Sequence, residues 1–343
     1  MKLKIKTKFA VAFFSLIFFF VLVVNPAFSA PTFHTHEQLI SMFTSLCDGY
    51  PSAASYDAIG ETWENKEILI FKIGNPEGGR VMWISAVHGW EDLGSEVQYL
   101  IAEWLLTSGD PEAQRILSRN YVLFIPLVNI DSYERENRNF ETDEYGVDLN
   151  RNFVTGWSYL APANTGFPNS YHGDFAGCEK ETQAIRNALQ TCRPSIFMDL
   201  HYGGGAYLRS YGADNSVANY VHSRIRELSA ETGISFPFSL TIGGSGGNGM
   251  AVADASSFGA DSWLCEMASE TEPYNTGGSC YWHTSHSLSD VQSYFYPKFL
   301  LVFRAMNEVC EIDLPPEPFP VPDPTYSGNI VIHSSGSINY GSS

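Results

Sequence analysis

The sequence predicts an α/β fold in which one layered β-sheet packs against helices. Short apolar runs of strand length alternate along the chain with longer segments whose apolar residues recur at helical spacing. The composition is 44% hydrophobic and only 17% charged, so the chain is not intrinsically disordered. With 343 residues it is long enough to bury a large core.

The predicted elements follow one another in a regular order. Helical spacing predicts helices at residues 36–47, 91–106, 179–190, 217–232 and 291–308. Strand-like apolar runs lie at residues 68–71, 81–84, 122–125, 196–198 and 263–265. Strands that alternate with helices are typical of an α/β layered sheet rather than a sandwich or a bundle.

The first 29 residues have the order of a secretory signal. Four lysines within residues 2–8 precede an apolar stretch at 9–24, and the small residues Ala27 and Ser29 stand before an expected cut at Ala30. The alternative is an uncleaved anchor, because a 16-residue stretch, apolar except for Ser15, is near the lower end of the length that spans a bilayer. The cleavage site favours a secreted protein, either extracellular or periplasmic.

The charge of the chain excludes nucleic acid as a partner. Lys and Arg number 20 against 38 Asp and Glu, a formal net charge of −18; without residues 1–29 the balance is 16 against 38, or −22. Nucleic-acid binding needs positive charge that displaces counterions from phosphates. The negative charge also disfavours adhesion to an anionic membrane, so no membrane contact is expected after signal cleavage.

Six cysteines form an even set, which in an exported protein predicts up to three disulfides. No CxxC pair occurs, which argues against a structural zinc cluster. Six cysteines allow fifteen connectivities. Pairing of sequence neighbours suggests Cys178–Cys192 and Cys265–Cys280, which leaves Cys47–Cys310.

The fold is expected to end near Asp313, because six of the ten residues 315–324 are proline, typical of an extended spacer. Residues 326–343 are rich in serine and glycine and are either a disordered tail or the start of a further module. The chain therefore divides into a signal peptide at 1–29, a single folded domain at 30–313 and a spacer with its tail at 314–343.

Three apolar runs end in residues that can carry chemistry. His88 and Glu91 follow one run, His201 closes a second and Glu266 follows a third. In open α/β sheets sites form at strand ends, and two histidines with a carboxylate can hold a zinc ion that keeps a position for water. Singly, each residue has an ordinary explanation, such as a hydrogen-bonded histidine or a partly exposed strand glutamate.

Residues 146–153, Gly-Val-Asp-Leu-Asn-Arg-Asn-Phe, resemble the signature of the zinc carboxypeptidase family, which contains pancreatic carboxypeptidase A. Asn129-Ile130-Asp131 stands where the family has an Asn-Pro-Asp-Gly turn. The order H-x-x-E, an arginine, the Asn-Arg pair, a strand-end His and a strand-end Glu also matches. The likeness covers residues 31–312 and implies a single-domain, three-layer α/β fold, a mixed β-sheet with helices on both faces.

The resemblance implies a role for each site residue. His88, Glu91 and His201 would bind one zinc ion per chain, and Glu266 would be the general base that activates the zinc-bound water. Arg138, with Arg135 as the competing assignment, would stabilise the oxyanion. Asn150 and Arg151 would hold the terminal carboxylate of the substrate, since an arginine fork binds a carboxylate in a bidentate way.

Two departures from the family bear on the substrate. The stretch 241–250 lacks the mobile tyrosine of the family, and Trp90 stands where the family has an arginine. The pocket for the C-terminal side chain, the S1′ pocket, should lie near Gly249, Met250 and Asp254. Glycine there implies no basic partner for an acidic side chain, whereas Asp254 or Asp261 could attract a basic one if it points inward.

The resemblance thus implies a secreted zinc metallocarboxypeptidase, a monomer whose partners are the C-termini of peptides and proteins. A cell-wall γ-D-glutamyl peptidase or an amidohydrolase on the same scaffold is one alternative. A non-catalytic binding module that keeps the fold is the other.

Overall fold

The computed structural model describes residues 33–133, 146–160, 170–202, 205–211, 215–243, 247–268 and 287–312, and the backbone of two short strands at 330–332 and 338–340. The signal at 1–29 and the proline-rich segment at 315–324 lie outside the described residues. The apolar run at 330–332 is β9 (Ile330–Ile332), which pairs antiparallel with β10 (Ile338–Tyr340).

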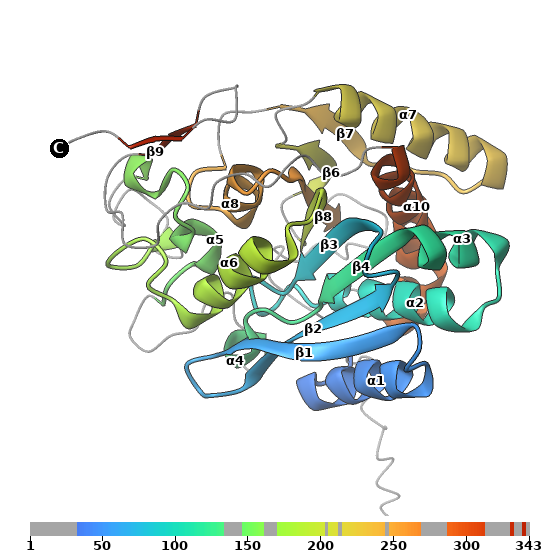
Figure 1. Ribbon diagram of the computed structural model, residues 1–343, viewed down its shortest axis with the longest axis horizontal. Coiled ribbons are helices and arrows are strands. Elements are labelled where there is room, and N and C mark those ends of the chain that lie inside the picture. The colour runs from blue at the N-terminus through green and yellow to red at the C-terminus, as the bar shows by residue number, and fades with distance from the viewer. Residues whose placement is uncertain are drawn as a thin grey trace, which may run out of the picture.

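One eight-stranded mixed sheet forms the middle layer, in the order β1-β2-β4-β3-β5-β8-β6-β7 (Figure 1). Its strands are β1 (Ala54–Glu61), β2 (Glu67–Gly74), β3 (Gly79–Ser85), β4 (Asn120–Ile125), β5 (Ile196–His201), β6 (Gly205–Ser210), β7 (Ser239–Ile242) and β8 (Asp261–Ala268). The four central strands β4, β3, β5 and β8 are parallel, while β2 pairs antiparallel with β4 and β6 antiparallel with β8. The central strands bring their carboxyl ends to one edge of the sheet.

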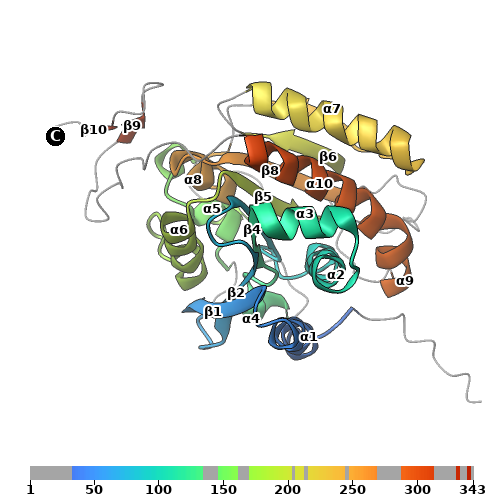
Figure 2. The same ribbon diagram turned by 45° about the vertical axis from the view of Figure 1, so that its right-hand side comes forward.

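Helices cover both faces of the sheet, which confirms the predicted three-layer α/β fold (Figure 2). One face carries α2 (Leu93–Thr107), α3 (Pro111–Arg119), α7 (Asn215–Thr232) and α10 (Tyr296–Ile312), and the other carries α6 (Lys180–Cys192) and α8 (Ala251–Ser257). The long helix α1 (His36–Gly49) packs beside α2. Shorter helices are α4 (Ile130–Tyr133), α5 (Leu149–Asn152), α9 (Leu288–Asp290), a 3₁₀ turn (Trp157–Tyr159) and a π turn (Val291–Phe295).

Aromatic side chains hold the layers together. The Phe303 ring of α10 lies 5.5 Å from that of Trp83 on β3 and 6.0 Å from that of Phe124 on β4. At the edge of the sheet, Phe43 of α1 stacks on Phe71 of β2 with ring centroids 4.6 Å apart. These side chains are fully buried, so the central strands have apolar neighbours on both faces, as parallel strands between helices do.

The predicted disulfides are corrected by the structure, because none of the five described cysteines forms a disulfide. Cys178 precedes α6 and Cys192 ends it, so the rise of the helix separates them by roughly 20 Å, well beyond the reach of a disulfide. Cys47 lies in α1 beside the edge of the sheet, whereas the Sγ of Cys310 lies 3.8 Å from the carbonyl oxygen of Arg80 on central strand β3. Cys265 is buried and free, and Cys280 lies outside the described residues.

In the described part of the chain we find no helix that combines the length and the apolar character needed to span a bilayer.

Candidate active site

The three predicted zinc ligands meet where β3 and β5 end. His88, Glu91 and His201 are all buried, and one ligand atom from each lies within 4.8 Å of the others. The two oxygens of Glu91 lie 2.8 Å from Nδ1 of His88 and 2.6 Å from Nδ1 of His201. The loop after β3 and the end of β5 therefore deliver two imidazoles and a carboxylate to one point.

The loop that carries His88 is held in a tight bend. Ala86 adopts a left-handed conformation with φ of 53°, and the backbone N–H of Asn129 donates to its carbonyl at 2.9 Å. Gly89 lies so close to the segment after β4 that a Cβ there would stand 2.2 Å from the carbonyl carbon of Ser132. Only glycine fits this approach, so the spacing between His88 and Glu91 depends on it.

Each imidazole has a buried aspartate at its outer nitrogen. Nε2 of His88 lies 3.0 Å from Asp148, and Nε2 of His201 lies 2.9 Å from Asp199. Such carboxylates orient a metal-binding imidazole and raise its basicity. Sequence reasoning did not identify either aspartate, although the two-residue period of a strand puts Asp199 on the face of His201.

The charges of the cluster suit a divalent cation. Burial opposes ionisation of Glu91, but the two imidazoles beside it outweigh this and hold the pKa of its carboxyl below the usual range. Burial also disfavours a charged His201, yet Asp199 and Glu91 raise its pKa well above the usual value. Glu91, Asp148 and Asp199 are three buried carboxylates around two imidazoles, and this donor set fits a catalytic zinc ion.

Asn150 lies beside the cluster and Arg151 follows it in α5, while their role in holding the substrate carboxylate stays a prediction. The backbone N–H of Ala251 donates to Oδ1 of Asn150 at 2.9 Å, which directs Nδ2 of Asn150 to a position 2.9 Å from Nε2 of His201. Arg151 donates from Nη1 to the carbonyl oxygen of Asn150 at 2.8 Å and remains partly exposed. The short helix α5 thus places the amide of Asn150 against His201, with the Arg151 guanidinium bonded to the backbone of the same helix.

Glu266 lies on β8, next to β5 in the sheet. It pairs with His201 on one side and with Tyr207 of β6 on the other, so the three side chains share one face of the sheet. The strand continues to Ala268, so Glu266 stands within β8 and not at its end as predicted.

The two aspartates considered for the S1′ pocket do not point into it. Asp254 is fully buried, with its carboxylate 2.6 Å from Nε of Arg186 and 2.6 Å from the backbone N–H of Thr155. Asp261 pairs with Ile196 at the start of β8, five residues before Glu266 and roughly 17 Å along the strand. Neither aspartate is placed to attract a basic substrate side chain.

Arg138 and the competing Arg135 lie within residues 134–145, outside the described residues, so their assignment stays a prediction.

Comparison with known proteins finds relatives of the family that the sequence motifs resemble. The family model described as zinc carboxypeptidase matches residues 39–279. Carboxypeptidase A6 of Mus musculus is 25% identical over 246 residues, which are 64% of this chain and 56% of that protein. The chain spans about half the length of the curated relatives it matches.

Two solved structures share the fold. Carboxypeptidase A from Helicoverpa armigera matches with a TM-score of 0.64 at 17% identity, covering 81% of this chain and 74% of its own. Thrombin activatable fibrinolysis inhibitor matches with a TM-score of 0.66 at 14% identity, covering 82% of this chain and 78% of its own.

Proposed function

This chain belongs to the zinc carboxypeptidase family, and from that premise we propose that it is a zinc-dependent metallocarboxypeptidase that hydrolyses the C-terminal peptide bond of peptides and proteins. The observation that carries the proposal is the buried cluster of His88, Glu91 and His201, whose ligand atoms lie within 4.8 Å of one another. These residues would hold the zinc ion, with Asp148 and Asp199 orienting the two imidazoles.

When bound, zinc would polarise the scissile carbonyl and lower the pKa of a water molecule. Glu266 would accept the proton of that water and pass it to the leaving amine, a role that its place beside His201 in the register of β5 and β8 supports. Arg138 would stabilise the developing oxyanion.

Asn150 and Arg151 would make the enzyme an exopeptidase. An amide beside His201 and the guanidinium of the next residue in the chain suit the free carboxylate at the end of a peptide. Zinc-loaded protein should therefore release single amino acids from free peptides and leave C-terminally amidated peptides intact.

The peptide test separates the proposal from its alternatives when it is run with and without a zinc chelator. Release of C-terminal amino acids that stops with the chelator supports the carboxypeptidase. Internal fragments, or cleavage of γ-D-glutamyl peptides alone, would support the cell-wall enzyme. Zinc binding with no turnover on any substrate would support the binding module.

We also propose that the protein is secreted as a monomer, with residues 1–29 as its signal, 30–313 as the catalytic domain and 314–343 as spacer and tail. Terminal sequencing of the exported protein should begin at Ala30, and light scattering should give one chain. A retained Met1 would contradict the cleaved signal.

A further inference from the structure

Arg209 of β6 lies on the same face of the sheet as the proposed general base. Glu266 of β8 pairs with Tyr207 of β6, and Leu264 pairs with Arg209. Cross-strand partners share a face, and every second residue of a strand points the same way. Arg209 is therefore a diagonal neighbour of Glu266, at a Cα separation of about 7–8 Å.

The opposite face of these strands is closed by helices. The ring of Trp263, the residue before Leu264, lies 5.4 Å from that of His222 on α7. The Arg209 face instead carries α8 and the segment that leads into it. Nε of Arg209 donates to the carbonyl oxygen of Gly243 at 3.2 Å, so the guanidinium is held directly after β7, six residues before Gly249, where the S1′ pocket is expected.

An aromatic ring supports the guanidinium. The Arg209 guanidinium lies 5.1 Å from the ring centroid of Tyr211, which lies on the same face of the sheet. Gly247 packs close to this ring, because a Cβ there would stand 3.5 Å from Cδ1 of Tyr211. Arginine stacked on an aromatic ring is held in plane, which favours a bidentate contact with a carboxylate.

No carboxylate pairs with Arg209 within the described residues, and both Nη atoms lack an acceptor there. Arg186, by contrast, forms an ion pair with Asp254. Tyr207 does not neutralise Arg209 at neutral pH, because burial, with Glu266 adding to the effect, raises the pKa of Tyr207 to about 12. Arg209 thus brings a positive charge to the pocket side of the general base.

We propose that Arg209 binds the side-chain carboxylate of the residue that is removed, so that the site prefers substrates ending in aspartate or glutamate. The inference rests on the proposed function. Arg151 would hold the α-carboxylate and Arg209 the side-chain carboxylate of the same residue. The strongly negative net charge of the chain does not oppose this, since specificity in a pocket depends on the groups that line it.

The test compares two N-acyl dipeptides that differ only in ending in glutamate or glutamine. With zinc-loaded wild type, we expect kcat/KM to be about 10–100-fold higher for the glutamate peptide, the range for a charge-assisted pair. Arg209→Gln should abolish this preference, lowering kcat/KM for the glutamate peptide to the level of the glutamine peptide measured with the same variant. Arg226→Gln, which removes an exposed charge on α7, is the matched control and should keep the preference.

Equal cleavage of the two peptides by wild type would overturn the inference and leave the carboxypeptidase intact. A glutamate preference that persists in Arg209→Gln would also overturn it. If neither peptide is cleaved, the proposed function fails, and calorimetric binding of N-acetylglutamate and N-acetylglutamine then decides the role of Arg209. Tighter binding of N-acetylglutamate that disappears in Arg209→Gln would support the inference, and equal binding would refute it.

Discussion

At the scale of single residues, Glu266 separates turnover from zinc binding. Glu266→Gln keeps the shape of the side chain and removes the proton acceptor. We expect kcat to fall by about 10²–10⁴-fold, with zinc content unchanged and KM little altered. Glu270→Gln and Glu272→Gln are controls. Near-normal kcat in Glu266→Gln with loss in Glu270→Gln would show that another residue on this segment is the base.

Asp199 tests whether a carboxylate that contacts a zinc ligand contributes to zinc affinity. It is fully buried and its Oδ2 lies 2.9 Å from Nε2 of His201. Asp199→Asn should weaken zinc binding by about 10–100-fold, because the imidazole loses the carboxylate that orients it and raises its basicity. Competition with a chromogenic chelator measures the affinity, and Asp57→Asn, an exposed aspartate on β1, is the control. An unchanged zinc affinity in Asp199→Asn would show that Asp199 does not support the metal ligand His201.

Glu181 of α6 gives a prediction about pH. Burial raises the pKa of its carboxyl from 4.5 to about 7, with Glu179 and Asp131 adding to the effect. Its own backbone N–H and the Trp63 N–H, at 3.3 Å, offset the lost solvation only in part. The folded pKa lies above the unfolded one, so the stability that protonated Glu181 contributes is present below about pH 4.5 and is lost as pH rises through about 7.

Glu181→Gln keeps the hydrogen-bond acceptor and removes the ionisation. The free energy of unfolding of wild type should fall between pH 5 and pH 8 by more than that of the variant. The difference between the two falls should be about 3 kcal/mol at most. Urea unfolding at pH 5 and pH 8 measures the difference, with Glu77→Gln at an exposed position as the control. An identical pH dependence in wild type and Glu181→Gln would refute the assignment.

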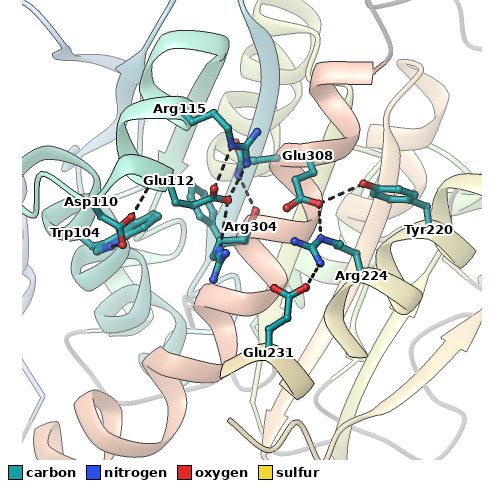
Figure 3. A network of polar contacts seen from close by, with 11 residues as sticks. Trp104, Asp110, Glu112, Arg115, Tyr220, Arg224, Glu231, Arg304 and Glu308 are labelled. Carbon is teal, nitrogen blue, oxygen red and sulfur yellow. Dashed lines mark hydrogen bonds and ion pairs between the residues drawn. The ribbon is translucent and has the colours of Figure 1, made fainter. Parts of the chain in front are cut away.

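At the scale of elements, charged side chains tie α10 to α7 and α3 (Figure 3). Glu308 of α10 accepts from Nε of Arg224 at 2.7 Å and from Tyr220 at 3.3 Å, both on α7. Arg224 also lies 2.9 Å from Glu231. On the other side, Arg304 of α10 and Arg115 share Glu112 of α3, at 3.4 and 2.8 Å.

Arg224 is the member of this network with the most partners, and its side chain is only 20% exposed. Arg224→Gln should destabilise the protein by about 1–2 kcal/mol, because Glu308 loses its cation, and the loss should shrink in 1 M salt. Arg226→Gln on the exposed side of the same helix should change the free energy of unfolding by no more than about 0.5 kcal/mol. Equal losses in the two variants would mean that the network adds nothing.

The elements that were predictable from the sequence are those whose residues are buried on both sides. Continuous apolar runs marked β2, β3, β4 and β5, and helical spacing marked the long helices, so the α/β fold followed. Strand β1 was missed because most of its side chains are exposed at the edge of the sheet, which leaves no apolar run. The short helix α3 was also missed, because it is largely polar and only Ala113 and Ile116 are buried, which leaves no apolar spacing to recognise.

The site divides in the same way. His88, Glu91, His201 and Glu266 were predictable because they follow apolar runs and match a family order, and the structure brings them to one edge of the sheet. Arg209 was not, because its place beside Glu266 depends on the antiparallel register of β6 against β8. The disulfide pairing was wrong because nearness in sequence ignores the length of α6.

At the scale of the whole molecule, the zinc cluster joins parts of the chain that are far apart in sequence. His88 and Glu91 follow β3, Asp148 caps the start of α5 and His201 ends β5, so one ion would connect the two central strands with the segment around α5. Four acidic side chains surround the cluster, namely Glu91, Asp148, Asp199 and Glu266. A divalent cation would relieve the repulsion between their negative charges. Metal binding should therefore stabilise the entire fold and not just the site.

Removal of the metal tests this. An ion that binds the folded chain alone stabilises it by about 2.7 kcal/mol when free zinc is a hundred times its dissociation constant, which corresponds to a rise in Tm of about 4–5 °C for a chain of this size. Protein treated with EDTA and dialysed should melt lower by this amount, and zinc at one equivalent per chain should begin to restore the Tm. His88→Ala should have the same Tm with and without zinc, because one of the three ligands is gone.

Magnesium is the control ion, since nitrogen ligands suit zinc and not magnesium. A Tm that responds to zinc equally in wild type and His88→Ala would place the stabilising ion elsewhere in the chain and contradict the ligand set.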